Sequence, residues 1–298
     1  MTRRVVVVVG ATSGIGLAAA LRFARGGDAL ILIARSEQSL QRTRAAVLHA
    51  GASDVLFHAG DVRNGDDMRA VIHAAITRHG RIDVLVQTAT TMAYGRVEDL
   101  PADVFDAVTE SAIRGTANLA RAALPIFRRQ GQGVFVIVNS LLGSVTAPTM
   151  RAYATAKWGQ RAIARTLQQE LRDSPGVKVC LIDPGSVNTP IYYQAANHVG
   201  RRARPPFPVS QPDRVAAAIV GVVERPRRNV SARVGPTNPL IIAGFRLLPM
   251  IYDAMVTPLF QLGALLREPV APTPGNVLKP QPVLERVHGH WPDRAESD

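Results

Sequence analysis

The chain has 298 residues and a formal net charge of +12, with 47% hydrophobic and 19% charged residues. This composition is too apolar for a disordered chain and is ordinary for a globular α/β protein. The basic residues are scattered and aromatic residues make up only 5%, which argues against nucleic-acid binding. A single cysteine, Cys180, excludes an intramolecular disulfide and predicts a reducing, cytoplasmic compartment.

Short β-branched runs alternate with longer helical patterns over the first two hundred or so residues. The first run leads straight into a glycine turn, which fits a buried strand better than a secretory signal peptide. Continuous apolar strands imply burial on both faces, and hence a parallel sheet with helices on both sides. The prediction is an α/β, Rossmann-like, doubly wound sheet whose ligand crevice lies at the carboxyl ends of the strands. We expect strands at 5–9, 29–33, 55–59, 82–86, 134–138 and 177–182, and the first two helices at 15–25 and 37–50.

The composition changes after these strands. Residues 192–212 are rich in Arg and Pro and predict a loop or lid. A helix at 213–224 and a last strand at 230–234 follow. We therefore divide the chain into a dinucleotide-binding and catalytic domain, residues 1–236, and a C-terminal extension, residues 237–298.

The extension begins with an apolar segment at 240–266, which predicts helix broken by Pro249 and Pro258. The rest of the extension is rich in proline and charge and predicts a flexible tail. The apolar segment is too short between its charges to span a bilayer. It either roofs a pocket or packs in an oligomer interface, or lies on a membrane surface, or is plain core. The roof and membrane interpretations both indicate a lipophilic substrate.

Glycines directly follow the first strand and open the first helix, in the run Gly10-Ala11-Thr12-Ser13-Gly14-Ile15-Gly16. Glycines let the backbone turn tightly and approach a pyrophosphate, and the helix N-terminus offers free N–H groups to the phosphates. The alternative is a tight turn without a ligand. The arrangement predicts a dinucleotide site.

The end of the second strand favours NADP(H) over NAD(H). An acidic residue there would bind the ribose 2′-hydroxyl, but this strand ends in Arg35 and Ser36. Arg35 can meet a 2′-phosphate with a planar fork of donors, and Ser36 can add a hydrogen bond. Arg35 could also be a solvated loop residue. Asp61, at the end of the third strand, is placed to accept from the adenine amino group, or to cap the next helix.

Tyr153 and Lys157 lie four residues apart in a helical stretch and so share one face. A nearby cation favours the phenolate, which makes Tyr153 a candidate general acid and base for an alcohol–carbonyl pair. Ser140, at the end of the strand 134–138, can hydrogen-bond the same substrate oxygen. No group of residues suggests a metal site, because His288 and His290 lack ligand companions.

Together these stretches resemble the short-chain dehydrogenase/reductase family over roughly residues 3–235. The resemblance implies hydride transfer, catalysis by Ser140, Tyr153 and Lys157, and a homodimer or homotetramer built partly on the long helices. It also implies that Lys157 holds the nicotinamide ribose and that Val187 and Thr189 contact the carboxamide. The matching runs are 8–16, Gly60-Asp61-Val62, Asn139-Ser140, Tyr153-Ala154-Thr155-Ala156-Lys157 and Asp183-Pro184-Gly185-Ser186-Val187-Asn188-Thr189-Pro190.

The chain departs from the family pattern in three places. The family has Asn-Asn-Ala-Gly after the fourth strand, where this chain has Gln87-Thr88-Ala89-Thr90. The family also has an asparagine that binds a water of the proton relay, where this chain has Ala112, and a threonine in place of Val9. These departures leave open a nucleotide-binding scaffold or membrane-surface protein with little turnover. The sequence as a whole predicts an NADP(H)-dependent oxidoreductase acting on the carbonyl or secondary alcohol of a small lipophilic molecule.

Overall fold

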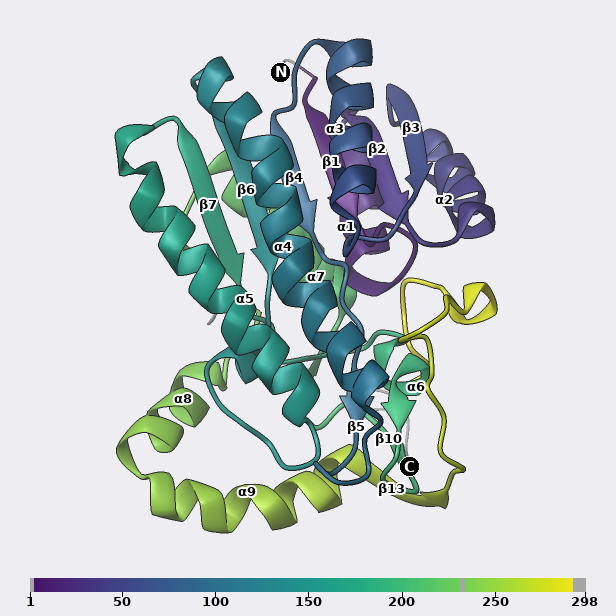
Figure 1. The fold of residues 1–298 in the computed structure, drawn as a ribbon, viewed down its shortest axis with the longest axis vertical. Helices are drawn as coiled ribbons and strands as arrows, with labels where there is room; N and C mark the ends of the chain where they lie inside the picture. The colour runs from purple at the N-terminus through teal and green to yellow at the C-terminus, as the bar shows by residue number, and fades with distance from the viewer. Residues whose placement is uncertain (1–2, 231–233, 292–298) are drawn as a thin grey trace.

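A computed structural model describes residues 3–230 and 234–291. Its core is a seven-stranded parallel sheet with the order β12-β7-β6-β4-β1-β2-β3 (Figure 1). The predicted α/β, doubly wound fold is confirmed. The strands are β1 (Val5–Val9), β2 (Ala29–Ala34), β3 (Asp54–Ala59), β4 (Val84–Gln87), β6 (Gly133–Val138), β7 (Val177–Ile182) and β12 (Asn229–Val230).

The central strands are apolar on both faces because helices cover both. β1 consists of five valines, all buried, and its Val7 pairs in register with Ile31 of β2 and Leu85 of β4. Cys180 of β7 is buried in the same way. Valine and isoleucine side chains, which are branched at Cβ, pack well on the pleated surface of a sheet. The continuous apolar runs therefore predicted burial on both faces correctly.

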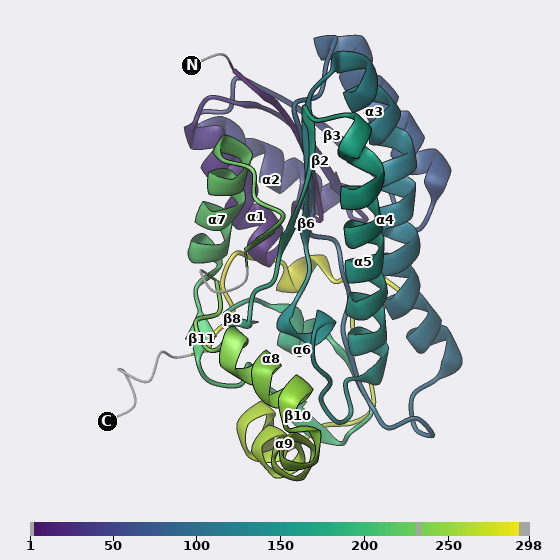
Figure 2. The same cartoon turned by 90° about the vertical axis from the view of Figure 1, so that its left-hand side faces the viewer.

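Two groups of helices sandwich the sheet (Figure 2). On one face, the core is built on α1 (Gly14–Arg25), α2 (Glu37–His49) and α7 (Pro212–Glu224). On the other face, it is built on α3 (Gly65–His79), α4 (Ala102–Gln130) and α5 (Arg151–Glu170). The strand order reverses at β1, whose neighbours are β2 and β4. Ligand crevices open at such a switch point, beyond the carboxyl ends of the strands.

The segment after β7 contains short elements that sequence patterns did not predict. Residues 192–212 form paired strands and a single helical turn instead of a plain loop. These strands pair through backbone hydrogen bonds with distant segments, which no local periodicity encodes. They are β5 (Ala93–Tyr94) with β9 (Ala196–Asn197), β8 (Ser186–Val187) with β11 (Val209–Ser210), and β10 (Arg201–Ala203) with β13 (Leu265–Pro269), beside α6 (Ile191–Gln194).

The apolar segment at 240–266 forms two helices and the start of a strand. α8 (Asn238–Leu247) and α9 (Pro249–Ala264) meet at Leu248. Pro249 is the first residue of α9, where its missing N–H costs nothing, whereas Pro258 lies inside α9 and does not end it. The prediction of two breaks is therefore wrong at Pro258. Among residues 3–230 and 234–291, no helix is both long and apolar enough to cross a membrane.

The tail follows a defined course along the body up to Trp291, with a short 3₁₀ turn η3 (Pro282–Leu284). Figure 1 shows it running in yellow from the end of β13 towards α2. The predicted last strand at 230–234 is represented by β12, and its residues 231–233 lie outside the described residues. The division of the chain at residue 236 stays a prediction.

Candidate active site

The geometry of the turn between β1 and α1 favours glycine at three positions. Gly10 and Gly14 have φ angles of +83° and +52°, in the region that favours glycine. A Cβ on Gly16 would lie only 2.1 Å from the Gly10 carbonyl oxygen. The Thr88 hydroxyl donates to the Val9 carbonyl oxygen at 2.6 Å and secures the turn from the end of β4. One of the residues that departs from the family pattern thus supports the glycine turn.

A cavity of about 360 Å³ lies along the carboxyl ends of the strands and begins at this turn. Ser140 and all the predicted cofactor residues except Ser36 line it. Ser36 is instead the N-cap of α2, where its hydroxyl oxygen accepts from the Ser39 N–H at 3.3 Å. The residues that line the cavity as predicted are Gly10, Thr12, Ser13, Gly14, Ile15, Gly16, Arg35, Asp61, Val62, Tyr153, Lys157, Pro184, Gly185, Val187 and Thr189.

One end of the cavity is charged. Asp61 forms an ion pair with Arg63 at 2.7 Å and does not cap the next helix, whose N-cap is Asn64. Burial lowers the pKa of Arg35, against the opposing charges of Asp61 and Glu285. Glu285 comes from the tail and lines the same end. This end therefore offers both a guanidinium and carboxylates to a ligand.

The tail reaches the cofactor end mainly through its backbone. The Arg35 guanidinium donates to the carbonyl oxygens of Asn276 at 2.6 Å and Val277 at 3.0 Å. The Gly14 N–H donates to the Arg286 carbonyl oxygen at 2.8 Å. The donors that the sequence assigned to a cofactor are thus bonded to the tail in this structure. No short motif in the sequence could show this, because the partners lie more than 240 positions apart.

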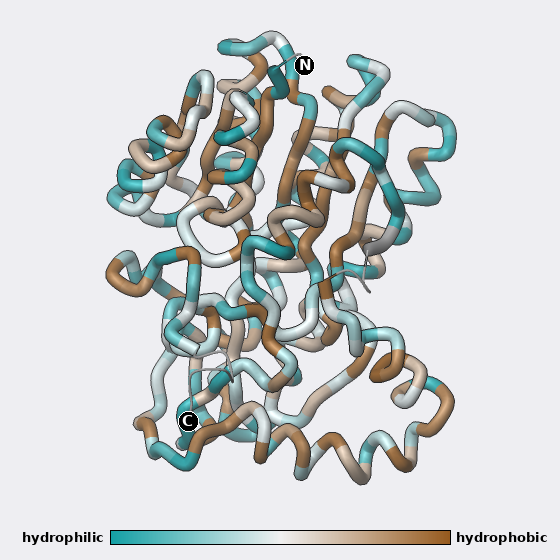
Figure 3. The backbone as a smooth tube through the Cα atoms, turned by 180° about the vertical axis from the view of Figure 1, so that it is seen from behind, coloured by the Kyte–Doolittle hydropathy of each residue, from teal (hydrophilic) through white to brown (hydrophobic). Residues whose placement is uncertain are grey.

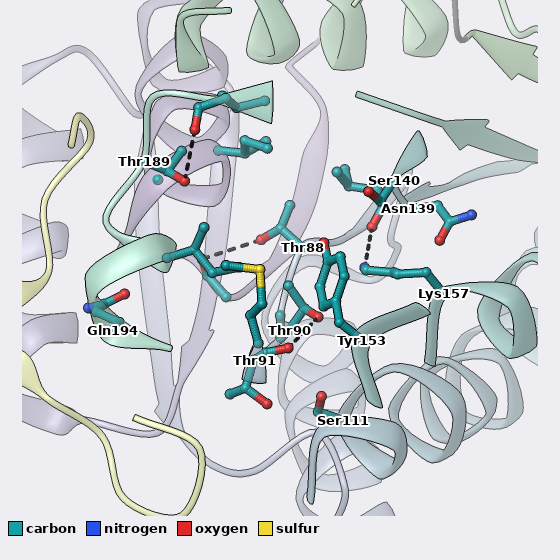
Figure 4. A pocket seen from close by; sticks show the side chains of 18 of the residues that line it. Thr88, Thr90, Thr91, Ser111, Asn139, Ser140, Tyr153, Lys157, Thr189 and Gln194 are labelled. Carbon is teal, nitrogen blue, oxygen red and sulfur yellow. Dashed lines mark hydrogen bonds between the residues drawn. The ribbon is translucent and has the colours of Figure 1, made fainter. Parts of the chain in front are cut away.

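The other end of the cavity holds the predicted catalytic residues. Tyr153 and Lys157 project from α5 beside Ser140, which follows β6 (Figure 4). The Lys157 Nζ atom lies 5.6 Å from the centroid of the Tyr153 ring. The Ser140 hydroxyl also accepts from the Leu142 N–H at 3.2 Å, which fixes the turn that carries it. The structure brings the three side chains together at the end of one strand.

Burial dominates the ionisation of this group. Tyr153 and Lys157 are 8% and 1% exposed. Burial raises the pKa of Tyr153 well above its ordinary value, although hydrogen bonding with Ser140 opposes that shift. Burial also lowers the pKa of Lys157 to about 7, against the attraction of Asp183. Both shifts have the physical cause expected for charged forms that are removed from water.

Apolar side chains surround the space next to Tyr153; the sequence suggested Tyr192 and the segment 240–266 as pocket lining, but not Met92, Tyr94 or Met150. They come from β5, the loop before α5, α6 and α9, which are far apart in the chain. Phe260 of α9 lies 6.4 Å from Tyr94, measured between ring centroids. The cavity lining here includes Met92, Tyr94, Met150, Tyr192, Tyr252 and Phe260.

Two further observations bear on the predicted site. Ala112 is fully buried in the apolar cluster beneath this end of the cavity, so no polar group stands at that position. Gln160, which the sequence did not single out, accepts a hydrogen bond from Lys157 at 2.9 Å. In the described part of the chain, no three His, Cys, Asp or Glu residues are grouped closely enough to hold a metal.

Known proteins resemble this chain in sequence and in fold. The family model for short chain dehydrogenase matches residues 4–199. The 2-(R)-hydroxypropyl-CoM dehydrogenase of Xanthobacter autotrophicus is 34% identical over 191 residues, which are 63% of this chain and 76% of that protein. An alcohol dehydrogenase from the archaeon Thermococcus sibiricus, solved with 5-hydroxy-NADP, is 27% identical with a TM-score of 0.67, over 77% of this chain and 95% of that one.

A second solved structure carries the other nicotinamide cofactor. This short-chain dehydrogenase/reductase from Burkholderia phymatum, in complex with NAD, is 25% identical with a TM-score of 0.72 and covers 91% of this chain and 98% of its own. Similar proteins thus bind either nicotinamide cofactor. The extent of the family match and the ordered site establish that this chain belongs to the short-chain dehydrogenase family.

Proposed function

We propose that the protein is an NADP(H)-dependent oxidoreductase that interconverts the carbonyl and secondary alcohol of a small lipophilic molecule. The observation that carries the proposal is one continuous cavity. It joins the glycine turn and Arg35 at one end to Tyr153 and an apolar lining at the other. A cofactor and an apolar substrate can meet there.

The residues present fit a dinucleotide. The glycine turn would hold the pyrophosphate, and it can form only with glycine at position 16, where a Cβ would clash with the Gly10 carbonyl oxygen. Arg35 supports NADP(H), because its guanidinium can pair with a 2′-phosphate once it leaves the tail carbonyls. When bound, the nicotinamide supplies or accepts the hydride. Val187 and Thr189 would flank the nicotinamide end.

The protein supplies the proton. In the reductive direction Tyr153 donates its phenolic proton to the substrate oxygen as the carbonyl carbon gains hydride, and in the oxidative direction it takes that proton back. Lys157, close to the Tyr153 ring, stabilises the phenolate through its positive charge. Ser140 hydrogen-bonds the same substrate oxygen. Burial keeps water from the reacting atoms.

The lining of the cavity supports an apolar substrate. Aromatic and methionine side chains surround the space beyond Tyr153, and α9 contributes Phe260 to them. An apolar carbonyl compound gains free energy by leaving water for such a site, about 25 cal/mol for each Å² that is buried. α8 and α9 would roof this substrate end.

The test is a screen of apolar ketones and secondary alcohols with NADPH and NADH, using the wild type and Tyr153→Phe. We expect turnover with NADPH as the better cofactor, and a loss of kcat of about 10³-fold in Tyr153→Phe, because the proton donor is removed. Ser144→Ala is a matched control, since this buried serine lies outside the cavity lining. NADPH binding without turnover of any carbonyl would favour the nucleotide-binding scaffold.

The proposal also includes a surface for peripheral membrane contact and an assembly of several subunits. Several large apolar side chains of α8 and α9 are exposed. Brown segments at the lower end of the molecule in Figure 3 mark hydrophobic residues of these helices. Leu240, Met250 and Leu262 are each more than 70% exposed. This surface is where peripheral membrane contact would form. A homodimer or homotetramer on α4 and α5 remains the proposed assembly.

A further inference from the structure

Lys157 is a buried cation with few polar neighbours. It is 1% exposed and donates to the Val138 carbonyl oxygen at 3.2 Å and to Gln160 Oε1 at 2.9 Å. An ammonium group has three N–H donors, so these two bonds leave one donor for the cavity that Lys157 lines. The two acceptors therefore determine where that third donor can point.

Gln160 lies one turn after Lys157 on α5 and is fully buried. Its Nε2 group donates to the Thr116 hydroxyl of α4 at 2.9 Å, and Thr116 is fully buried as well. A buried amide in an apolar helix interface costs free energy unless both of its ends are bonded. Here both ends are bonded, one to Lys157 and the other to the neighbouring helix.

The orientation of the amide is fixed by its partners. An ammonium group can only donate, so the atom of Gln160 that faces Lys157 is the oxygen. The NH₂ end must then face α4, where the Thr116 hydroxyl accepts from it. Thr116 stands four residues after Ala112 and thus on the same face of α4. The hydroxyl of Thr116 therefore lies on this face of α4, one turn beyond Ala112.

We propose that Gln160 is the positioning residue for Lys157, because its amide, braced by Thr116, holds the ammonium group with one N–H free for the cavity. Only the kinetic consequence of this inference rests on the proposed function. It assigns the polar side-chain contact with Lys157 to Gln160 of α5, which Thr116 of α4 braces, in a chain where position 112 is apolar. Without Gln160, the buried ammonium loses its one side-chain acceptor in the described structure.

Among the described residues, few other charged or titratable groups lie near Lys157. On the same helix, Tyr153 faces it, and beyond β7 Asp183 attracts it. Asp183 is itself paired with Arg161 at 2.8 Å, which balances much of its charge. Gln160 is therefore the neighbour whose removal changes the environment of Lys157 without adding or deleting a formal charge.

The experiment follows Lys157 directly. The sequence has only three lysines, Lys157, Lys178 and Lys279, so protein labelled with ¹³C at lysine Cε gives three signals to assign. Lys178→Arg and Lys279→Arg identify the other two. A titration of the full-length protein between pH 5 and pH 10 then reports the protonation of Lys157, whose pKa burial lowers to about 7.

Three variants give distinct expectations. Gln160→Leu should lower the Lys157 midpoint by about one pH unit, because an acceptor that favours the charged form is lost. Gln160→Glu should raise it, because a carboxylate favours the ammonium more strongly. Gln168→Leu should leave it unchanged, since this buried glutamine of the same helix bonds the carbonyl oxygens of Val179 and Arg228.

An unchanged Lys157 midpoint in both Gln160 variants would overturn the proposal. If Gln160→Leu does not fold, Thr116→Val and Gln160→Glu decide, because Thr116→Val removes only the acceptor that orients the amide. Where the wild type turns over an apolar ketone, Gln160→Leu should also lower kcat at pH 7 by about tenfold and move the pH profile of alcohol oxidation to higher pH. The NMR titration stands even if no carbonyl substrate is found, so the two proposals fail separately.

Discussion

The two walls of the cavity are built in different ways. The wall formed by the strand ends and α5 presents side chains, such as Tyr153 and Lys157, that buried contacts hold in place. The opposite cover, residues 270–291, reaches the body through its main chain, with carbonyl oxygens of Val277 and Arg286 accepting from Arg35 and Gly14. One wall depends mainly on polar side-chain contacts, and the cover combines main-chain contacts with the packing of Val277 and Trp291.

This difference predicts how each wall responds to mutation. Single substitutions should be severe in the first wall where they break a buried polar contact, such as that between Lys157 and Gln160. In the cover most single substitutions should be mild, since every residue except proline offers the same backbone groups. Removal of the whole cover should be costly, because all of its main-chain contacts go together.

Two expected effects are the largest and are of similar size, and the first concerns Lys157 and pH. Its native pKa of about 7 lies below the ordinary value of 10.5, so the unfolded chain binds more protons between these values. Stability gained through Lys157 therefore rises as pH increases above 7, by about 1.4 kcal/mol per unit. Between pH 7 and pH 9, the free energy of unfolding of the wild type should gain about 2–3 kcal/mol relative to Lys157→Met.

Urea denaturation of both proteins across this pH range measures that difference. Lys178→Met is the matched control, because Lys178 is exposed on β7 and its loss should give a flat difference. A flat difference for Lys157→Met as well would mean that burial of the ammonium group is not a cost in the native state.

Deletion of residues 270–298 should have an effect of similar size. It removes Val277, which is fully buried, together with the bonds to Arg35 and Gly14. We expect the free energy of unfolding to fall by about 2–4 kcal/mol, and a chain that lacks only residues 292–298 serves as the control. An unchanged urea midpoint after the longer deletion would show that the cover does not pack on the body in solution.

The smallest expected effect is that of Arg286→Ala. The residue bonds Gly14 through its carbonyl oxygen, which alanine retains. The free energy of unfolding should therefore change by less than about 0.5 kcal/mol, against about 1–2 kcal/mol for Val277→Ala in the same cover. If Arg286→Ala proved the more damaging of the two in thermal melts, side chains would specify the cover as well.

The sequence predicted the first wall well and the second poorly, for the same reason. Strand periodicity, the glycine turn and the Tyr153–Lys157 spacing are local patterns, and each keeps its meaning in the fold. The contacts of Arg35 with Asn276 and Val277, and of Phe260 with Tyr94, join segments that no local pattern relates. Ser36 shows that a motif does not predict the role of every residue in it. Its place in the pattern suggested a bond to the 2′-phosphate, but its hydroxyl caps α2.

The single cysteine has a practical consequence. Cys180 is buried in β7, and burial raises the pKa of its thiol to about 11, so the reactive thiolate is scarce at neutral pH. The chain therefore behaves towards maleimides and alkylating reagents much as a cysteine-free protein would. A probe attached to one cysteine introduced at Leu262, which is 73% exposed on α9, would report the movement of that helix without first removing the native thiol.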